Sequence, residues 1–380
     1  MTEANGRHLP PEIVEETLCK LPVKSLKRFS CVSKSWQSLI SEHRFVRKHL
    51  SIAAQPDNLS QKTLILNDVL RPTRENMHCI PLASVQSVPV MGGEYLGGPC
   101  AGDDREILAS CDGLLCIRID QSVYIWNPCL KTYRKIFSPT GNSTFADLGT
   151  LFFGLGYDSV RDDYKLIKLS NTNWPEYKTE TEVYSLRSGS WTKLDDFPQG
   201  YLLYYFTSVF VNGSIHWLAI GWYIEPNPFV IFSFDLSDNK YRKMTLSDCW
   251  PVPPTCLVLV KMCVMKGMLC VLVDWKSCLV LWAMKDYYSD QKSWTKILEI
   301  PFDLVFSEYC TRMEVKPFYM YENGNILMGV VSKHKTELLI CKDNAVLFRE
   351  IIFPWESFIR YGIVHVESLV SPLPVENGEE

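Results

Sequence analysis

One pattern recurs along most of this 380-residue chain: two short apolar runs joined by a turn that contains glycine. The four clearest turns hold Gly113, Gly213, Gly267 and Gly324. At three of them the glycine follows Asp or Asn, and such pairs suit tight turns that need a positive φ. The pattern therefore predicts antiparallel β-hairpins repeated through the body of the chain.

A second element follows most of these hairpins. It is a strand, a polar turn, and then an aromatic residue with a nearby Lys that leads into an apolar residue; the aromatic residues are Tyr133, Trp191, Tyr241 and Trp294. Four antiparallel strands repeated every roughly 40–55 residues describe a blade of a β-propeller. Residues 106–370 leave room for five or six blades. We expect "KTLILND" and "YGIVHVESLV" to complete one blade together and close the ring. A two-sheet β-sandwich is the alternative.

Residues 9–50 have a different pattern, typical of helices. Pro10 and Pro11 suit a helix start, and Pro22 ends the first apolar stripe. Three helices in about forty residues bury little surface, and modules of that size usually need a staple or a partner. The three stripes are Ile13, Val14, Thr17, Leu18 and Leu21; Val23, Leu26 and Phe29; and Val32, Trp36, Leu39 and Ile40.

Charge argues against a grip on nucleic acid. The net charge is -4, although the first 50 residues hold nine basic and five acidic residues. A whole-protein field that attracts phosphate is therefore absent. The basic residues Lys24, Lys27, Arg28 and Lys34 lie beside a wide apolar stripe, which favours a protein partner. We expect them to be solvated or to form a rim around that contact.

The sequence offers no pattern for catalysis, a cofactor or a metal. The fourteen cysteines include no C-x-x-C pair, and nucleotide-binding, zinc-protease and serine-hydrolase motifs do not occur. We expect His216 to be a packed or hydrogen-bonded core residue, and Arg161–Asp163 to form a hairpin turn with an ion pair. No secretory signal or membrane span is expected, and cysteines in this pattern suit a reduced compartment, the cytoplasm and/or the nucleus.

At this point the residues resemble a known family. "LPPEIVEETLCKLPVKSLKRFSCVSKSWQSLI", followed by "HRFVRKHL", is similar to an F-box. The phrases "SCDGLLCI", "IWNPCLKTYRKI", "FGLGYDSVRDDYKLIKL", "EVYSLRSGSWTKL" and "VFVNGSIHWLA" resemble the F-box-associated, kelch-like domain of plant F-box proteins. The resemblance implies an α+β multidomain chain: residues 1–8 as a flexible N-terminus, 9–50 as a three-helix F-box, 51–105 as a linker with one strand and a flexible insertion, 106–370 as the β domain and 371–380 as an acidic tail.

The resemblance also implies partners. An F-box docks on the Skp-type adaptor of a cullin–RING ubiquitin ligase, so we expect a non-catalytic receptor that presents a target protein for ubiquitination. The alternative is an F-box scaffold or inhibitor that delivers no target. By position, the residues matched to the family's apolar sites, some facing the adaptor and others packing the module, are Leu9, Pro10, Ile13, Leu18, Leu21, Pro22, Val23, Leu26, Val32, Trp36, Leu39 and Ile40.

Four long connections in the β domain are rich in aromatic residues. Interface anchors favour Trp and Tyr, so these connections are the candidate target-binding sites. The alternative is that several of the rings cap blade cores. The candidates are Trp174, Tyr177, Tyr201, Tyr204, Trp222, Tyr223 and Trp250.

Overall fold

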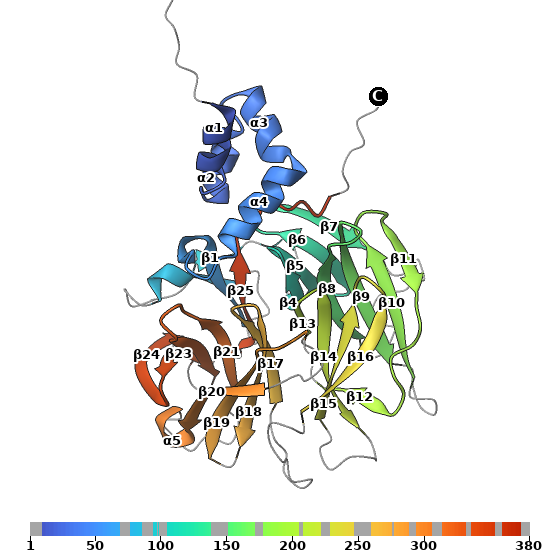
Figure 1. Cartoon of the computed structure of the whole chain (residues 1–380), viewed down its shortest axis with the longest axis vertical. Helices are drawn as coiled ribbons and strands as arrows, with labels where there is room; N and C mark the ends of the chain where they lie inside the picture. The colour runs from blue at the N-terminus through green and yellow to red at the C-terminus, as the bar shows by residue number, and fades with distance from the viewer. Residues whose placement is uncertain are drawn as a thin grey trace, which may run out of the picture.

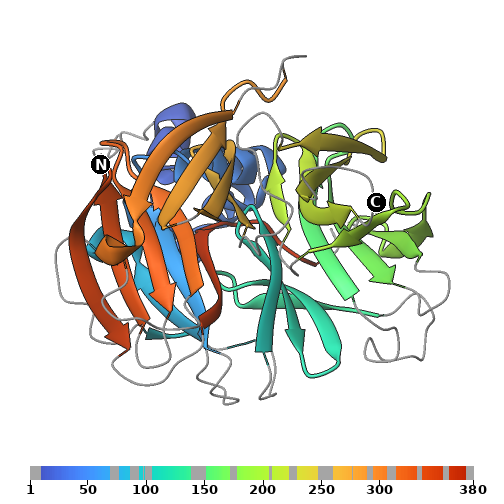
Figure 2. The same cartoon turned by 90° about the horizontal axis from the view of Figure 1, so that it is seen from below.

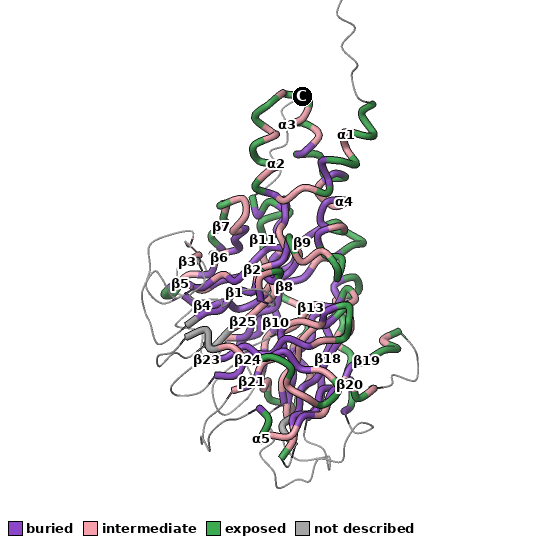
Figure 3. Tube along the Cα trace, turned by 90° about the vertical axis from the view of Figure 1, so that its left-hand side faces the viewer, coloured by how far each residue is buried: buried purple, intermediate pink, exposed green. Residues whose placement is uncertain are grey.

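The computed structural model shows a ring of antiparallel sheets with a group of helices on one face (Figure 1). Figure 2 looks onto the opposite face, with the helices behind the ring. Figure 3 shows that buried residues concentrate in the strands, whereas the helices carry many exposed and half-buried ones. The structure describes residues 10–68, 77–85, 94–96, 98, 105–137, 151–171, 178–204, 208–221, 229–246, 260–275, 277–288, 294–305, 314–331, 336–353 and 359–373.

Four helices form the N-terminal module. α1 (Pro11–Leu18), α2 (Val23–Phe29) and α3 (Lys34–Ser41) confirm the three helices predicted from the apolar stripes. α4 (His43–Ala53) was not predicted and runs from the module to the ring (Figure 1). Shorter helical elements are η1 (Leu59–Gln61), η2 (Leu82–Ser84) and α5 (Phe302–Val305).

Six sheets among the described residues form the blades, which settles the predicted count of five or six at six and excludes the sandwich. Each sheet has four strands, except that the inner strand of one blade is divided in two, β12 and β13. The blades are β4 (Arg105–Cys111), β5 (Leu114–Ile119), β6 (Ser122–Asn127) and β7 (Thr132–Ile136); β8 (Leu151–Asp158), β9 (Asp163–Asn171), β10 (Thr179–Ser185) and β11 (Ser190–Lys193); β12 (Tyr201–Leu203), β13 (Val209–Val211), β14 (Ser214–Gly221), β15 (Phe229–Asp235) and β16 (Lys240–Thr245); β17 (Val260–Met265), β18 (Met268–Trp275), β19 (Cys278–Met284) and β20 (Trp294–Pro301); β21 (Glu314–Met320), β22 (Ile326–Val331), β23 (Thr336–Lys342) and β24 (Ala345–Phe353); and β25 (Ile359–Val366), β1 (Lys62–Asp68), β2 (Met77–Pro81) and β3 (Glu94–Tyr95).

The last of these blades joins the two ends of the chain. β25 pairs with β1 in antiparallel register, with Ile363 opposite Ile65. This confirms that the two segments complete one blade together. The expectation of a single strand in residues 51–105 was wrong, because this stretch supplies β1, β2 and β3. Its many Gly, Pro and Ser residues are typical of loops, so the sequence pattern did not predict the short strands β2 and β3. The domain boundaries themselves stay predictions.

Turn chemistry explains the repeated hairpins. Asp112, Asn212 and Lys266 have positive φ, and so does the glycine that follows each of them. Two successive residues at positive φ form the type I′ turn that matches the twist of paired strands. The fourth turn is longer, and in it only Gly324 has a positive φ.

The recurring aromatic residues lie on the outer strands, opposite residues of the third strand. Tyr184 pairs with Trp191 and Phe234 with Tyr241 in register, and the ring centroids lie 5.2 Å and 4.9 Å apart. Aromatic cross-strand pairs stabilise antiparallel sheets. The repeat therefore marks the outer hairpin of each blade.

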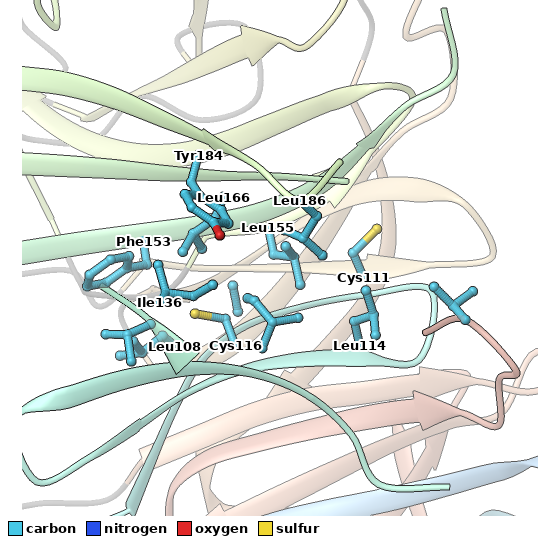
Figure 4. Packing of buried hydrophobic residues seen from close by; sticks show 14 of the residues in the cluster. Leu108, Cys111, Leu114, Cys116, Ile136, Phe153, Leu155, Leu166, Tyr184 and Leu186 are labelled. Carbon is cyan, nitrogen blue, oxygen red and sulfur yellow. The ribbon is translucent and has the colours of Figure 1, made fainter. Parts of the chain in front are cut away.

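The core lies between blades. Six separate apolar clusters fill the six interfaces between neighbouring sheets. On β1, Leu64 and Leu66 face one neighbouring blade and Ile65 faces the other, as alternation along a strand requires. Figure 4 shows one interface, in which Leu108 and Cys116 lie opposite Phe153 and Leu155. A sandwich has one such interface, so the ring of six distinguishes the two folds.

Candidate functional site

The three N-terminal helices begin at residues that favour helix starts. Pro10 and Pro22 precede α1 and α2, and neither helix has a side-chain cap of its own at that position. Ser33 precedes α3, and its hydroxyl accepts a hydrogen bond from the Trp36 amide at 3.2 Å. Serine at this position satisfies one of the free amides of the first turn. Local sequence thus places the helix carrying Trp36.

The twelve residues predicted for adaptor contact divide into groups by exposure. Leu18, Val23, Leu26 and Ile40 are buried in the core of the module. Leu21, Pro22, Trp36 and Leu39 are half-buried. Pro10, Ile13 and Val32 are exposed, and Leu9 lies outside the described residues.

Two of the exposed residues stand out because they are apolar. Ile13 is 48% exposed on α1, and Val32, between α2 and α3, is 66% exposed. Trp36 packs edge-on against Phe29 with ring centroids 5.6 Å apart, so it serves the module's own core in part. In the described part of the module, these two side chains are the large apolar groups most open to solvent.

The end of the F-box module that carries the last turn of α2 faces the propeller ring. The Lys27 ammonium donates to the Leu130 carbonyl at 3.1 Å, so this exposed residue contacts the propeller; Lys24, Arg28 and Lys34 are exposed as well. The His49 ring hydrogen-bonds the Leu21 carbonyl at 2.9 Å, and burial lowers the pKa of His49. α1 and α3 lie farther from the ring than α4 does (Figure 1).

A polar network joins α4 to two blade turns. Arg47 donates to the Asp112 carboxylate at 3.1 Å and to the Tyr164 hydroxyl at 3.0 Å, and Tyr164 donates to Asp112 at 2.9 Å. The Arg47 guanidinium also lies 3.9 Å from the ring centroid of Tyr157. A charged hydrogen bond combined with a cation–π contact fixes an arginine in one geometry.

Asp162 extends this network. The Tyr157 hydroxyl donates to Asp162 at 2.5 Å, and the His43 ring lies 3.1 Å from the same carboxylate. Burial and the Asp162 carboxylate raise the pKa of Tyr157 to about 12, so its hydroxyl stays a donor at neutral pH. We call Arg47, Asp112, Tyr157, Tyr164, His43 and Asp162 the interface network. Sequence reasoning missed it, although Asp112 was visible as the residue before Gly113.

Connections on the two faces of the ring differ in length. Most of those on the helix side have two to five residues, such as 112–113, 159–162 and 186–189. On the opposite side several have seven or more, such as 172–178 and 246–259. The strand ends that flank three of the four aromatic-rich connections lie on this second face, which we call the distal face, and the fourth begins there between β11 and β12 and continues into the inner strand.

Two of the seven aromatic candidates can be placed. Tyr201 pairs with Gly221 at the distal end of β14, and its hydroxyl accepts a hydrogen bond from Lys243 at 2.7 Å. Tyr204 packs edge-on against Phe229, with centroids 5.2 Å apart. Both rings therefore also pack on their blade, and their role in target binding stays a prediction. The other five candidates, Trp174, Tyr177, Trp222, Tyr223 and Trp250, lie outside the described residues.

Other polar candidates have structural roles. His216 is buried and hydrogen-bonds the Tyr287 hydroxyl at 2.8 Å, which confirms a core histidine. Arg161 pairs with Asp158 at 2.9 Å and Asp162 has a positive φ, which confirms a hairpin turn with an ion pair. Within the described ranges no cluster of three potential metal ligands occurs, and no helix there is long and apolar enough to cross a membrane. The ten described cysteines are free, and five of them are buried.

Comparisons with known proteins agree with this architecture. The family model of the F-box domain matches residues 7–48, and that of the F-box associated beta propeller domain matches residues 98–372. The chain belongs to this family of F-box proteins. An F-box together with this propeller indicates an F-box protein of the substrate-adaptor type.

Similar proteins come from Arabidopsis thaliana. An F-box/kelch-repeat protein is 31% identical over 317 residues, covering 77% of this chain and 80% of the relative. F-box/WD-40 repeat-containing protein 1 is 30% identical over 62% of this chain and 55% of its own length. Another F-box protein is 24% identical over 95% of this chain and 91% of its own. An oligogalacturonate lyase in complex with manganese has a TM-score of 0.42 at 8% identity, over 75% of this chain and 77% of that one, a likeness too weak to carry an argument.

Proposed function

We propose that this F-box protein is the target-recognition subunit of a cullin–RING ubiquitin ligase. Its F-box helices bind a Skp-type adaptor, and through it the cullin and RING subunits. The distal face of the propeller binds a target protein. The protein performs no bond-making step itself, and it acts in the cytoplasm and/or the nucleus.

The observation that carries this proposal is the separation of the two surfaces. Exposed apolar residues, Ile13 and Val32, lie on the F-box module. The strand ends that flank three of the long aromatic connections lie on the distal face of the same molecule. A molecule with both surfaces holds a target beside the transfer machinery and raises its effective concentration there.

Adaptor binding tests the first half of the proposal. We expect Ile13→Asp combined with Val32→Asp to weaken binding to a purified Skp-type adaptor at least about 30-fold, since buried interface anchors contribute about 2 kcal/mol or more each. Both residues are exposed, so the substitutions leave the fold intact. Calorimetric titration measures the effect.

Val160→Asp is the matched control. Val160 is 73% exposed on a propeller turn, so this variant should bind like the unmodified protein. Unaltered binding by the double variant, or no binding by the full chain, would reject the adaptor role.

Target delivery needs a second experiment. Proximity labelling with the full chain and with the Ile13/Val32 double variant should capture the same targets, because the distal face is unchanged. Those targets should accumulate in cells that lack the protein. Targets whose levels do not respond would favour the scaffold alternative.

A further inference from the structure

The segment after the last strand of the propeller, residues 367–370, contacts the F-box. The Glu367 carboxylate accepts a hydrogen bond from the Val23 amide at 3.0 Å. This amide lies at the start of α2, where Pro22 supplies no side-chain cap. A residue 344 positions away along the chain therefore satisfies a free amide at the start of this helix.

Leu369 completes the core of the module. It is 9% exposed and packs with Leu18, Val23 and Leu26. Among the buried members of this cluster in the described part of the chain, Leu369 is the one from outside the F-box helices. The core of a module this small depends strongly on each large apolar side chain.

The propeller holds this segment in place. The Asn127 side-chain amide donates to the carbonyls of Ser368 and Val370 at 2.9 Å and 2.8 Å. Ser368 also packs so closely against Gly113 that a Cβ there would lie 2.3 Å from the Ser368 Cβ. The position of residues 367–370 therefore depends on two turns of the β4–β7 blade and on the pairing of β25 with β1.

We infer that the F-box completes its fold only on a closed propeller. The helices are synthesised first, but their core and the start of α2 are completed only when the last residues of the chain are in place. Adaptor binding, which rests on the function proposed above, is then restricted to molecules whose ring has closed. The dependence of the F-box fold on residues 367–370 stands without that function.

Hydrogen exchange of the full-length protein tests the inference. Leu369→Ala should speed amide exchange in α1 and α2 at least about tenfold. Removing a buried leucine leaves a cavity, and the resulting loss of stability raises the population of the open, exchanging state by more than that factor. Exchange in β14 and β15, on another blade, is the internal reference and should not change. Glu367→Ala should speed exchange at the start of α2 alone.

Leu373→Ala is the matched control, because Leu373 lies in the same tail but is 47% exposed. It should exchange like the unmodified protein. The inference is overturned if Leu369→Ala matches this control, or if α1 and α2 accelerate no more than β14 and β15 do.

Adaptor binding by the same variants tests the consequence. Leu369→Ala should bind a purified Skp-type adaptor at least about tenfold more weakly than Leu373→Ala. Equal binding by the two variants would overturn the restriction to closed rings. If the unmodified protein does not bind the adaptor, the proposed function fails, whereas the exchange data still decide whether the F-box fold depends on Leu369.

Discussion

At the residue scale, a buried histidine links the last strand to a turn on the F-box face. His365 lies on β25, and its Nε2 is 3.0 Å from the Gly113 carbonyl. The hydrogen bond requires a proton on Nε2, which the neutral ring can supply. Burial lowers the pKa of His365 to about 4, because the surroundings disfavour a charge.

This shift predicts a pH dependence of stability. The pKa of His365 in the folded protein lies below the value of about 6.5 in an unfolded chain. The contribution is therefore complete above pH 6.5 and is lost as the pH falls from there towards 4. Between pH 7 and pH 5 the loss is about 2 kcal/mol.

Urea unfolding of the unmodified protein and of His365→Gln, at pH 7 and at pH 5, measures this contribution of His365 to the free energy of unfolding. Other groups titrate equally in both proteins, so the difference between their pH slopes isolates the histidine. We expect the free energy of unfolding of the variant to fall about 2 kcal/mol less between pH 7 and pH 5. Parallel slopes would show that His365 is not buried as a neutral ring.

At the element scale, the F-box helices differ in how they begin. Of the first three, α3 has a side-chain cap from its own sequence, at Ser33, and it carries Trp36 and Leu39. α2 is capped by Glu367 from the far end of the chain. The start of α3 is therefore stabilised by a residue next to it in sequence, whereas the start of α2 is stabilised by a residue that only the folded protein brings near.

Ser33→Ala should destabilise α3 by about 1 kcal/mol, because the Trp36 amide loses its acceptor. Amide exchange within residues 34–41 should then be about fivefold faster. Ser38→Ala is the control, since Ser38 is exposed within the same helix. Equal exchange in the two variants would mean that the cap adds nothing to α3.

The same contrast explains what the sequence could predict. Period-two alternation, turn residues and apolar stripes are local, so they indicated the hairpins, the first three helices and the closing strand pair. Contacts such as Arg47 with Asp112 and Val23 with Glu367 join residues 65 and 344 positions apart. Nothing local marks Arg47 or Glu367 as different from a solvated surface charge. Apolar spacing likewise could not separate buried Leu26 from exposed Val32.

At the scale of the whole molecule, the ring is closed by strand pairing. β25 brings Ile363 and Val364 to the two interfaces that flank the closing blade. Without it, β1 would present an unpaired edge, and both interfaces would lose apolar contacts. Open edges of this kind promote aggregation.

A chain that ends at residue 358 should therefore fail to form a cooperative, monomeric propeller. A chain that ends at residue 373 keeps β25 and residues 367–370 and is the control. Thermal unfolding and size-exclusion chromatography compare the two. A sharp transition and a monomeric elution volume for the shorter chain would show that closure is dispensable.

The alternation of short turns and long connections has an evolutionary consequence. The turn on the F-box side at Asp112 and Gly113 combines positive φ with a contact to α4, so substitutions there disturb both the hairpin and its junction with the F-box module. The connections on the distal face join strand ends that lie on the side of the ring away from α4 (Figure 1). We expect changes in their length or sequence to leave the contacts between α4 and the ring in place. Copies of such a gene would then be expected to diverge in what they recognise before they diverge in how they fold.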